Sequence, residues 1–147
     1  ILEFIESGKT DGADLLTGGC KPNDSNLSKG SFILPTIFDA VTQNMRIWNE
    51  EIFGPIMSIK QWTDFDEMIN LANELIYGLT ASIITNDLNK AMETASRLEA
   101  GYVWINSSGR YLGAPYGGWK QSGLGQEECL EELLSYTRLK NINLAWE

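Results

Sequence analysis

The central part of the chain alternates apolar segments of strand length with segments of helical periodicity. Residues 55–62, 79–85 and 102–106 are apolar and short, as expected of buried strands. Each of the two intervening segments repeats apolar residues at helical spacing, and only a few residues connect the elements. Strand, helix, strand, helix, strand with short connections is typical of parallel βαβ units, so the predicted fold class is α/β.

The two predicted helices carry start and stop signals. Asp64 and Glu67 are spaced like a capping box before the first helix, and Asn86-Asp87 is placed to cap the second. Gly78 and Gly101 are expected to end them. The residues expected to face inward are Phe65, Met68, Ile69, Ala72 and Leu75 on the first helix, and Leu88, Ala91, Met92, Ala95 and Leu98 on the second.

The flanking segments have weaker patterns. Residues 1–8 resemble the end of a helix, and residues 32–41 form two extended apolar stretches broken at Pro35. Residues 126–136 are predicted to form a helix with Leu130, Leu133 and Leu134 inward. Residues 137–147 are expected to form a last strand, because Ile142, Leu144 and Trp146 alternate with smaller or polar residues.

Composition excludes several classes of function. The net charge of −9 disfavours binding to nucleic acid or to an anionic membrane. We find neither an apolar run long enough to cross a bilayer nor a signal peptide, so we expect a soluble, cytoplasmic protein. The chain has no histidine, and Cys20 and Cys129 have unrelated surroundings, so we predict neither a metal site nor a disulfide framework.

Three sequence motifs follow one another at characteristic spacing. They are EEIFGP at residues 50–55, preceded by LPTIF at 34–38, then GYVWIN at 101–106, and APYGGWKQSGLG at 114–125. An acidic segment and the stretch YTRLK follow the last motif. Together with the Leu-x-x-Gly-Gly pattern that ends at Gly19, these motifs resemble the aldehyde dehydrogenase superfamily over essentially the whole chain.

The resemblance implies an enzyme that oxidises an aldehyde to a carboxylic acid with NAD or NADP. In this family a cysteine thiolate forms a thiohemiacetal that transfers hydride to the nicotinamide, and a glutamate activates the hydrolytic water. The resemblance places Glu51 at the hydroxyls of the nicotinamide ribose and Phe53 beside that ribose. A carboxylate can accept hydrogen bonds from both hydroxyls of a vicinal diol. On composition alone, Glu50-Glu51 would instead be a solvated pair and Phe53 a core residue.

The resemblance also places the loop 107–116 at the aldehyde entrance. Ser107, Arg110, Tyr111 and Tyr116 are then the candidate substrate-binding residues. An aromatic lining suits an apolar or aromatic aldehyde, and Arg110 would suit an anionic one. Loop arginines more often point to solvent, which leaves the class of aldehyde open.

The chain departs from the family pattern after Gly125. Gln126 stands where the family commonly has arginine, and Glu128 or Cys129 replaces a family glycine. Four glutamates surround Cys129 and disfavour its thiolate, and Cys20 has no base nearby. In the family, the reactive cysteine, the base and the Rossmann segment lie upstream of the position that corresponds to Ile1. We therefore predict no catalytic residue in this chain.

The expected organisation is a truncated, C-terminal part of a catalytic domain over residues 1–136, followed by an oligomerisation strand over 137–147. Its partners would be an aldehyde, the rest of the catalytic and Rossmann domains, and further subunits in a homodimer or homotetramer. The alternative is a non-catalytic protein of this family with a structural or binding role.

Overall fold

The computed structural model describes residues 1–27 and 29–146, and it divides the chain into two compact units, Ile1–Met68 and Ile69–Glu147. The boundary falls inside helix α3 (Phe65–Glu74).

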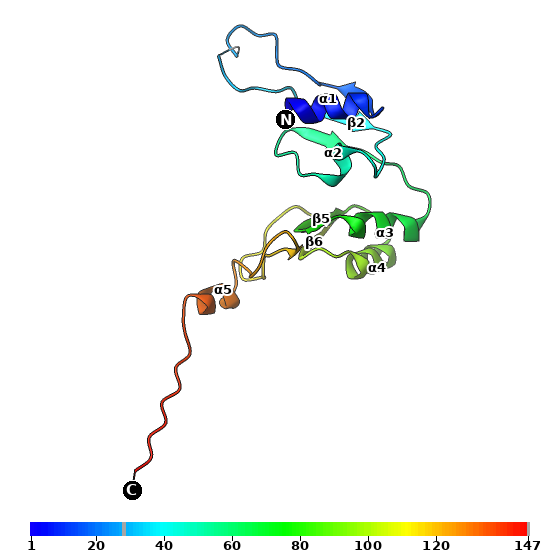
Figure 1. Cartoon of the computed structure of the whole chain (residues 1–147). Coiled ribbons are helices and arrows are strands. Elements are labelled where there is room, and N and C mark those ends of the chain that lie inside the picture. The colour runs from blue at the N-terminus through cyan, green and yellow to red at the C-terminus, as the bar shows by residue number, and fades with distance from the viewer. Residues whose placement is uncertain (28, 147) are drawn as a thin grey trace. The chain divides into compact units, whose positions relative to one another are not determined.

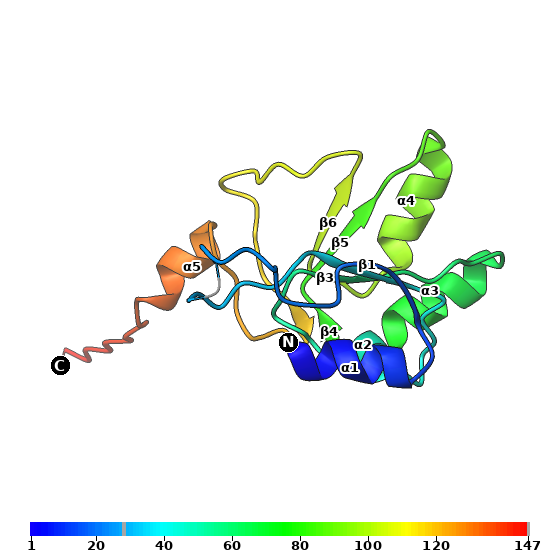
Figure 2. The same cartoon turned by 90° about the horizontal axis from the view of Figure 1, so that it is seen from above.

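The first unit packs two helices on a small mixed sheet. It contains α1 (Leu2–Thr10), β1 (Asp14–Thr17), β2 (Thr36–Asp39), α2 (Arg46–Asn49) and β3 (Ile56–Ser58), which are labelled in Figure 1 or Figure 2. The strands lie in the order β1-β2-β3, with β1 antiparallel and β3 parallel to β2. The buried core consists of Ile5, Ala13, Phe38, Val41, Met45 and Ile47.

The first predicted βαβ unit is wrong, because β3 belongs to the sheet of β2. Thr36 pairs with Ile56, and the pairing continues beyond β3, where the Ile59 amide donates to the Phe38 carbonyl at 2.8 Å. The strand is also shorter than the predicted residues 55–62. The partner of β3 is thus β2, which lies in the apolar segment 32–41. The sequence pattern instead placed residues 55–62 in a βαβ unit with the strand that follows the next helix.

The second unit is built around a parallel pair of strands. After α3 come β4 (Tyr77–Gly78), β5 (Thr80–Ile83), α4 (Leu88–Arg97), β6 (Tyr102–Ile105), β7 (Trp119–Lys120) and α5 (Leu130–Ser135). The register of β5 and β6 runs from Thr80 opposite Tyr102 to Ile83 opposite Ile105. Helix α4 connects these strands and lies beside them in Figure 2, while β4 pairs with β7 in an antiparallel ladder.

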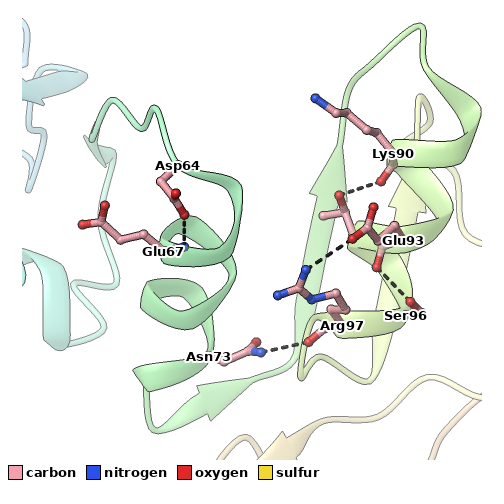
Figure 3. Close-up of polar contacts among 8 residues, drawn as sticks. Asp64, Glu67, Asn73, Lys90, Glu93, Ser96 and Arg97 are labelled. Carbon is pink, nitrogen blue, oxygen red and sulfur yellow. Dashed lines mark hydrogen bonds and ion pairs between the residues drawn. The ribbon is translucent and has the colours of Figure 1, made fainter.

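The predicted helix starts are confirmed. Asp64 Oδ1 accepts a hydrogen bond from the Glu67 amide at 2.8 Å, which is visible in Figure 3, and Asp87 Oδ1 accepts one from the Lys90 amide at 3.0 Å. Asn73 then links the ends of α3 and α4. Its amide donates to the Arg97 carbonyl at 2.8 Å (Figure 3), and its oxygen accepts from the Glu99 amide at 2.9 Å.

The predicted inward faces of these two helices are only partly correct. The buried residues are Ile69 and Leu71 in α3, and Ala91 and Thr94 in α4. Leu88 and Met92 were expected inside but are exposed. The neighbouring β5 and β6 form a sheet of two strands, which can cover only a narrow strip of a helix. Helix α3 ends at Glu74, and Gly78 lies in β4 instead of terminating the helix.

The C-terminal segment differs most from its prediction. Helix α5 begins at Leu130 instead of residue 126, because the backbone of Glu127 pairs with that of Tyr116. Leu130, Leu133 and Leu134 are exposed, contrary to the prediction.

The tail after α5 is extended and exposed. Residues 137–146, drawn in red in Figure 1, form neither helix nor strand, and residue 147 of the predicted strand lies outside the described residues. Its apolar side chains are at least 80% exposed, and they are Leu139, Ile142, Leu144 and Trp146. The tail therefore does not pack onto the rest of the second unit. Among the described residues, no helix is both long and apolar enough to cross a membrane.

Candidate functional site

A polar clasp closes the parallel strand pair at the start of the predicted substrate loop. The Asn106 side chain accepts a hydrogen bond from the Thr85 amide at 2.9 Å and donates to the Thr85 carbonyl at 2.8 Å. Asn106 has a φ of 51°, in the left-handed region, which asparagine tolerates better than most residues. The clasp fixes the point and the direction in which the loop 107–116 leaves β6.

Aromatic side chains of β6 then hold the loop. Trp104 Nε1 donates to the Gly109 carbonyl at 2.7 Å, and the Tyr102 hydroxyl accepts from the Tyr111 amide at 3.3 Å. Ser107 contributes a local bond, since its Oγ accepts from the Gly109 amide at 3.3 Å. The loop backbone is thus tied to two residues on the same face of one strand.

Arg110 is fixed by two neighbours. Its Nη2 lies 2.9 Å from Glu128 Oε1, and its guanidinium carbon lies 4.0 Å from the centre of the Tyr116 ring. The Tyr116 ring in turn packs 5.5 Å from that of Tyr102. Stacking on an aromatic face together with a carboxylate contact is a favourable arrangement for a guanidinium.

Glu128 ties the loop to the chain a second time, through its backbone. Its carbonyl accepts from the Gly113 amide at 3.0 Å, and its own amide donates to Glu132 Oε2 at 2.6 Å. Glu128 has a φ of 62°, a conformation that costs a residue with a side chain roughly 1 kcal/mol. Glycine avoids this cost, so the backbone at position 128 would favour the glycine that the family commonly has near this point.

The glycine-rich segment passes close to the chain's own backbone. A Cβ atom at Gly101 would collide with the carbonyl oxygen of Gly117, so a side chain cannot be accommodated there. This contact brings the third motif against the start of β6, and thereby places Tyr116 near Tyr102.

The structure brings together some of the predicted substrate residues. Arg110 and Tyr116 are in contact, and Tyr111, 67% exposed, leaves its ring free to meet a ligand. Ser107 is half-buried and acts within the loop. Sequence reasoning missed Tyr102, Trp104 and the role of Glu128. The alternation of Tyr102 and Trp104 along the predicted strand already placed them on one face, and could have identified the first two.

The candidate cofactor residues belong to the first unit and follow α2. Arg46 Nε lies 2.8 Å from Glu50 Oε1, and this hydrogen bond raises the pKa of Arg46 above its ordinary value. The guanidinium also stacks 4.1 Å from the centre of the Phe4 ring. Glu50 is therefore engaged, whereas the exposed Glu51 carboxylate makes no hydrogen bond or ion pair within the described part of the chain.

Phe53 lies at the surface of the first unit. It is 83% exposed and has a φ of 50°, so the alternative that it is a core residue is wrong for this chain. The turn is anchored directly afterwards, where the Pro55 carbonyl accepts from the Thr36 amide at 2.8 Å. An accessible carboxylate and an accessible aromatic ring, two residues apart, fit a ribose with two neighbouring hydroxyls.

The described residues contain no cluster of potential metal ligands. Cys20 is exposed and Cys129 half-buried, and both are free thiols. The pKa of Glu131 is below its ordinary value, because its carboxylate accepts a hydrogen bond from its own backbone amide and another from Cys129. Residues 127–132 contain four glutamates and no basic residue, so this segment is anionic.

Comparison with known proteins assigns the family. Residues 1–142 match the aldehyde dehydrogenase family. The chain is 45% identical to the aldehyde dehydrogenase tropH of Talaromyces stipitatus, over 98% of this chain and 29% of that protein.

Two solved structures are also similar. A Mycobacterium tuberculosis aldehyde dehydrogenase complexed with NAD+ has a TM-score of 0.88 and 36% identity, over 93% of this chain and 28% of the other. A mutant of the P. syringae indole-3-acetaldehyde dehydrogenase in complex with NAD+ and IAA has a TM-score of 0.88 and 44% identity, over 95% and 28%.

The chain therefore belongs to the aldehyde dehydrogenase family, with an α/β fold similar to that of its members. It spans less than a third of the length of these relatives, and it covers 29% of the tropH protein.

The ion pair of Arg110 can be tested on the chain itself by limited trypsin digestion. Replacing Glu128 by Gln removes the charge that holds Arg110, so cleavage after Arg110 should accelerate about fivefold, as expected for the loss of about 1 kcal/mol of local stability. Cleavage after Arg138, in the exposed tail, is the internal reference and should not change. An unchanged ratio of the two cleavage rates would show that Glu128 does not restrain the loop.

Proposed function

We propose that this chain is the C-terminal part of an NAD(P)-dependent aldehyde dehydrogenase that oxidises an aldehyde to a carboxylic acid. The observation that carries the proposal is the family match over residues 1–142, combined with a free Glu51 carboxylate and a displayed Phe53 at the motif positions for the nicotinamide ribose. The two similar structures are complexes with NAD+, and we propose that the cofactor of this protein is NAD or NADP.

In this proposal Glu51 and Phe53 hold the cofactor in place. Glu51 accepts hydrogen bonds from the two ribose hydroxyls, and the ring of Phe53 packs beside the ribose. When bound, the nicotinamide supplies a hydride acceptor. Glu50 keeps its bond to Arg46, so Glu51 remains free to bind the hydroxyls.

The loop 107–116 lines the aldehyde entrance in the proposed enzyme. Ser107, Arg110, Tyr111 and Tyr116 face the substrate, and the clasp at Asn106 together with β6 keeps the loop in place. A rigid loop orients an aldehyde without an additional entropic cost at the reacting centre.

The reactive cysteine and the general base lie outside this chain in the proposal. Neither Cys20 nor Cys129 has a basic side chain as a hydrogen-bond partner in the described part of the chain. The competing hypothesis is a non-catalytic member of the family. A protein with this chain but without a cysteine-bearing segment would favour that hypothesis.

The role of Glu51 is tested in the longer protein that contains this chain. Glu51→Gln keeps the shape but replaces an acceptor oxygen by a donor, so hydride transfer should slow by roughly one to two powers of ten, about 1.5–3 kcal/mol. Single-turnover formation of reduced nicotinamide measures this change.

Glu74→Gln is the control, since it removes one charge from an exposed carboxylate at the end of α3 and should leave the rate within about twofold. The 147-residue chain alone should form no reduced nicotinamide. Equal rates for Glu51→Gln and the unaltered protein would refute the role of Glu51, and cysteine-dependent turnover by the chain alone would refute the proposed division of the active site.

We also propose that residues 137–147 add a strand to a sheet formed largely by residues outside this chain, in a homodimer or homotetramer. The support is the exposure of Leu139, Ile142, Leu144 and Trp146, which no part of the described chain covers. Light scattering of the longer protein with and without residues 137–147 tests this. The shortened protein should have a smaller mass, and an unchanged oligomer would contradict the assignment.

A further inference from the structure

We propose that Glu128 makes the substrate loop selective for neutral aldehydes, because it neutralises Arg110, the one cationic side chain between residues 107 and 116. This inference rests on the proposed function, in which that loop lines the aldehyde entrance. It concerns the class of substrate, which the motifs leave open.

The geometry of Arg110 supports neutralisation. The guanidinium contacts Glu128 Oε1 at 2.9 Å on one side and the Tyr116 ring at 4.0 Å on another. The Glu128 side chain is only 25% exposed, so solvent screens this contact less than a fully exposed pair. An anionic substrate would have to compete with a carboxylate that is already in place.

The position of Glu128 makes the contact durable. Its carbonyl accepts the hydrogen bond from Gly113 and its amide donates to Glu132, so its backbone is held at both sides. The Glu132 carboxylate accepts this bond at 2.6 Å and so helps to hold the backbone of Glu128 in place.

The neighbouring aromatic surface acts in the same direction. The ring of Tyr111 is exposed and offers an apolar surface to an uncharged substrate.

The test compares benzaldehyde with 4-carboxybenzaldehyde, which has the same ring and aldehyde and an added para carboxylate, in the longer protein that contains this chain. The unaltered protein should have the larger kcat/KM for benzaldehyde. In Glu128→Gln the freed guanidinium can pair with the substrate carboxylate, so the ratio of kcat/KM for 4-carboxybenzaldehyde over benzaldehyde should rise about tenfold, mainly through KM.

Two further variants separate this effect from a general change in charge or structure. Glu127→Gln removes the same charge one residue away and should leave the ratio within about twofold. The double variant Glu128→Gln/Arg110→Gln lacks the guanidinium and should return the ratio to that of the unaltered protein. This reversal would not follow if Glu128 acted only on stability.

The outcomes distinguish this inference from the proposed function. If the unaltered protein oxidises benzaldehyde but Glu128→Gln has the same ratio as Glu127→Gln, selection by Glu128 is refuted and the proposed function stands. A preference of the unaltered protein for 4-carboxybenzaldehyde also overturns the inference. Absence of aldehyde oxidation by the unaltered protein overturns the proposed function, and the inference with it.

Discussion

The second unit depends on the parallel pairing of β5 and β6 and on the clasp that ends it. Four residue pairs set the register, and the two hydrogen bonds between Thr85 and Asn106 prevent the strands from slipping. The later contacts of the loop 107–116 depend on this fixed starting position. Trp104 and Tyr102 bind the loop backbone because the register presents both on one face, and Tyr116 can reach Tyr102 only when the loop has a fixed origin.

The sequence predicted the parts of the fold that depend on local chemistry. Asp64 and Asp87 cap their helices as expected, because a carboxylate before a helix satisfies free amides regardless of the distant surroundings. The partner of β3 is a long-range choice. An apolar strand pattern is equally compatible with pairing to β2 or to β5, and only the complete packing of the first unit decides.

The candidate site shows the same division between local and distant causes. The motif around Glu51 and Phe53 could be located from sequence, and the structure adds that Arg46 engages Glu50 and leaves Glu51 free. The pairing of Arg110 with Glu128 could not be found in this way, because 17 positions separate the two residues and no periodicity relates them. The departure from the family glycine was visible in the sequence, but its meaning requires the backbone angle of Glu128.

The extended tail after α5 has a consequence for how this chain behaves in solution. Its apolar side chains contribute exposed surface and no packing, so the chain's own fold places no requirement on their chemistry. Exchanging Leu139 and Ile142 for polar residues should therefore improve solubility at little cost in folding free energy. Under the proposal that the tail adds a strand to another sheet, the apolar character of these residues would serve that sheet and not the fold of this chain.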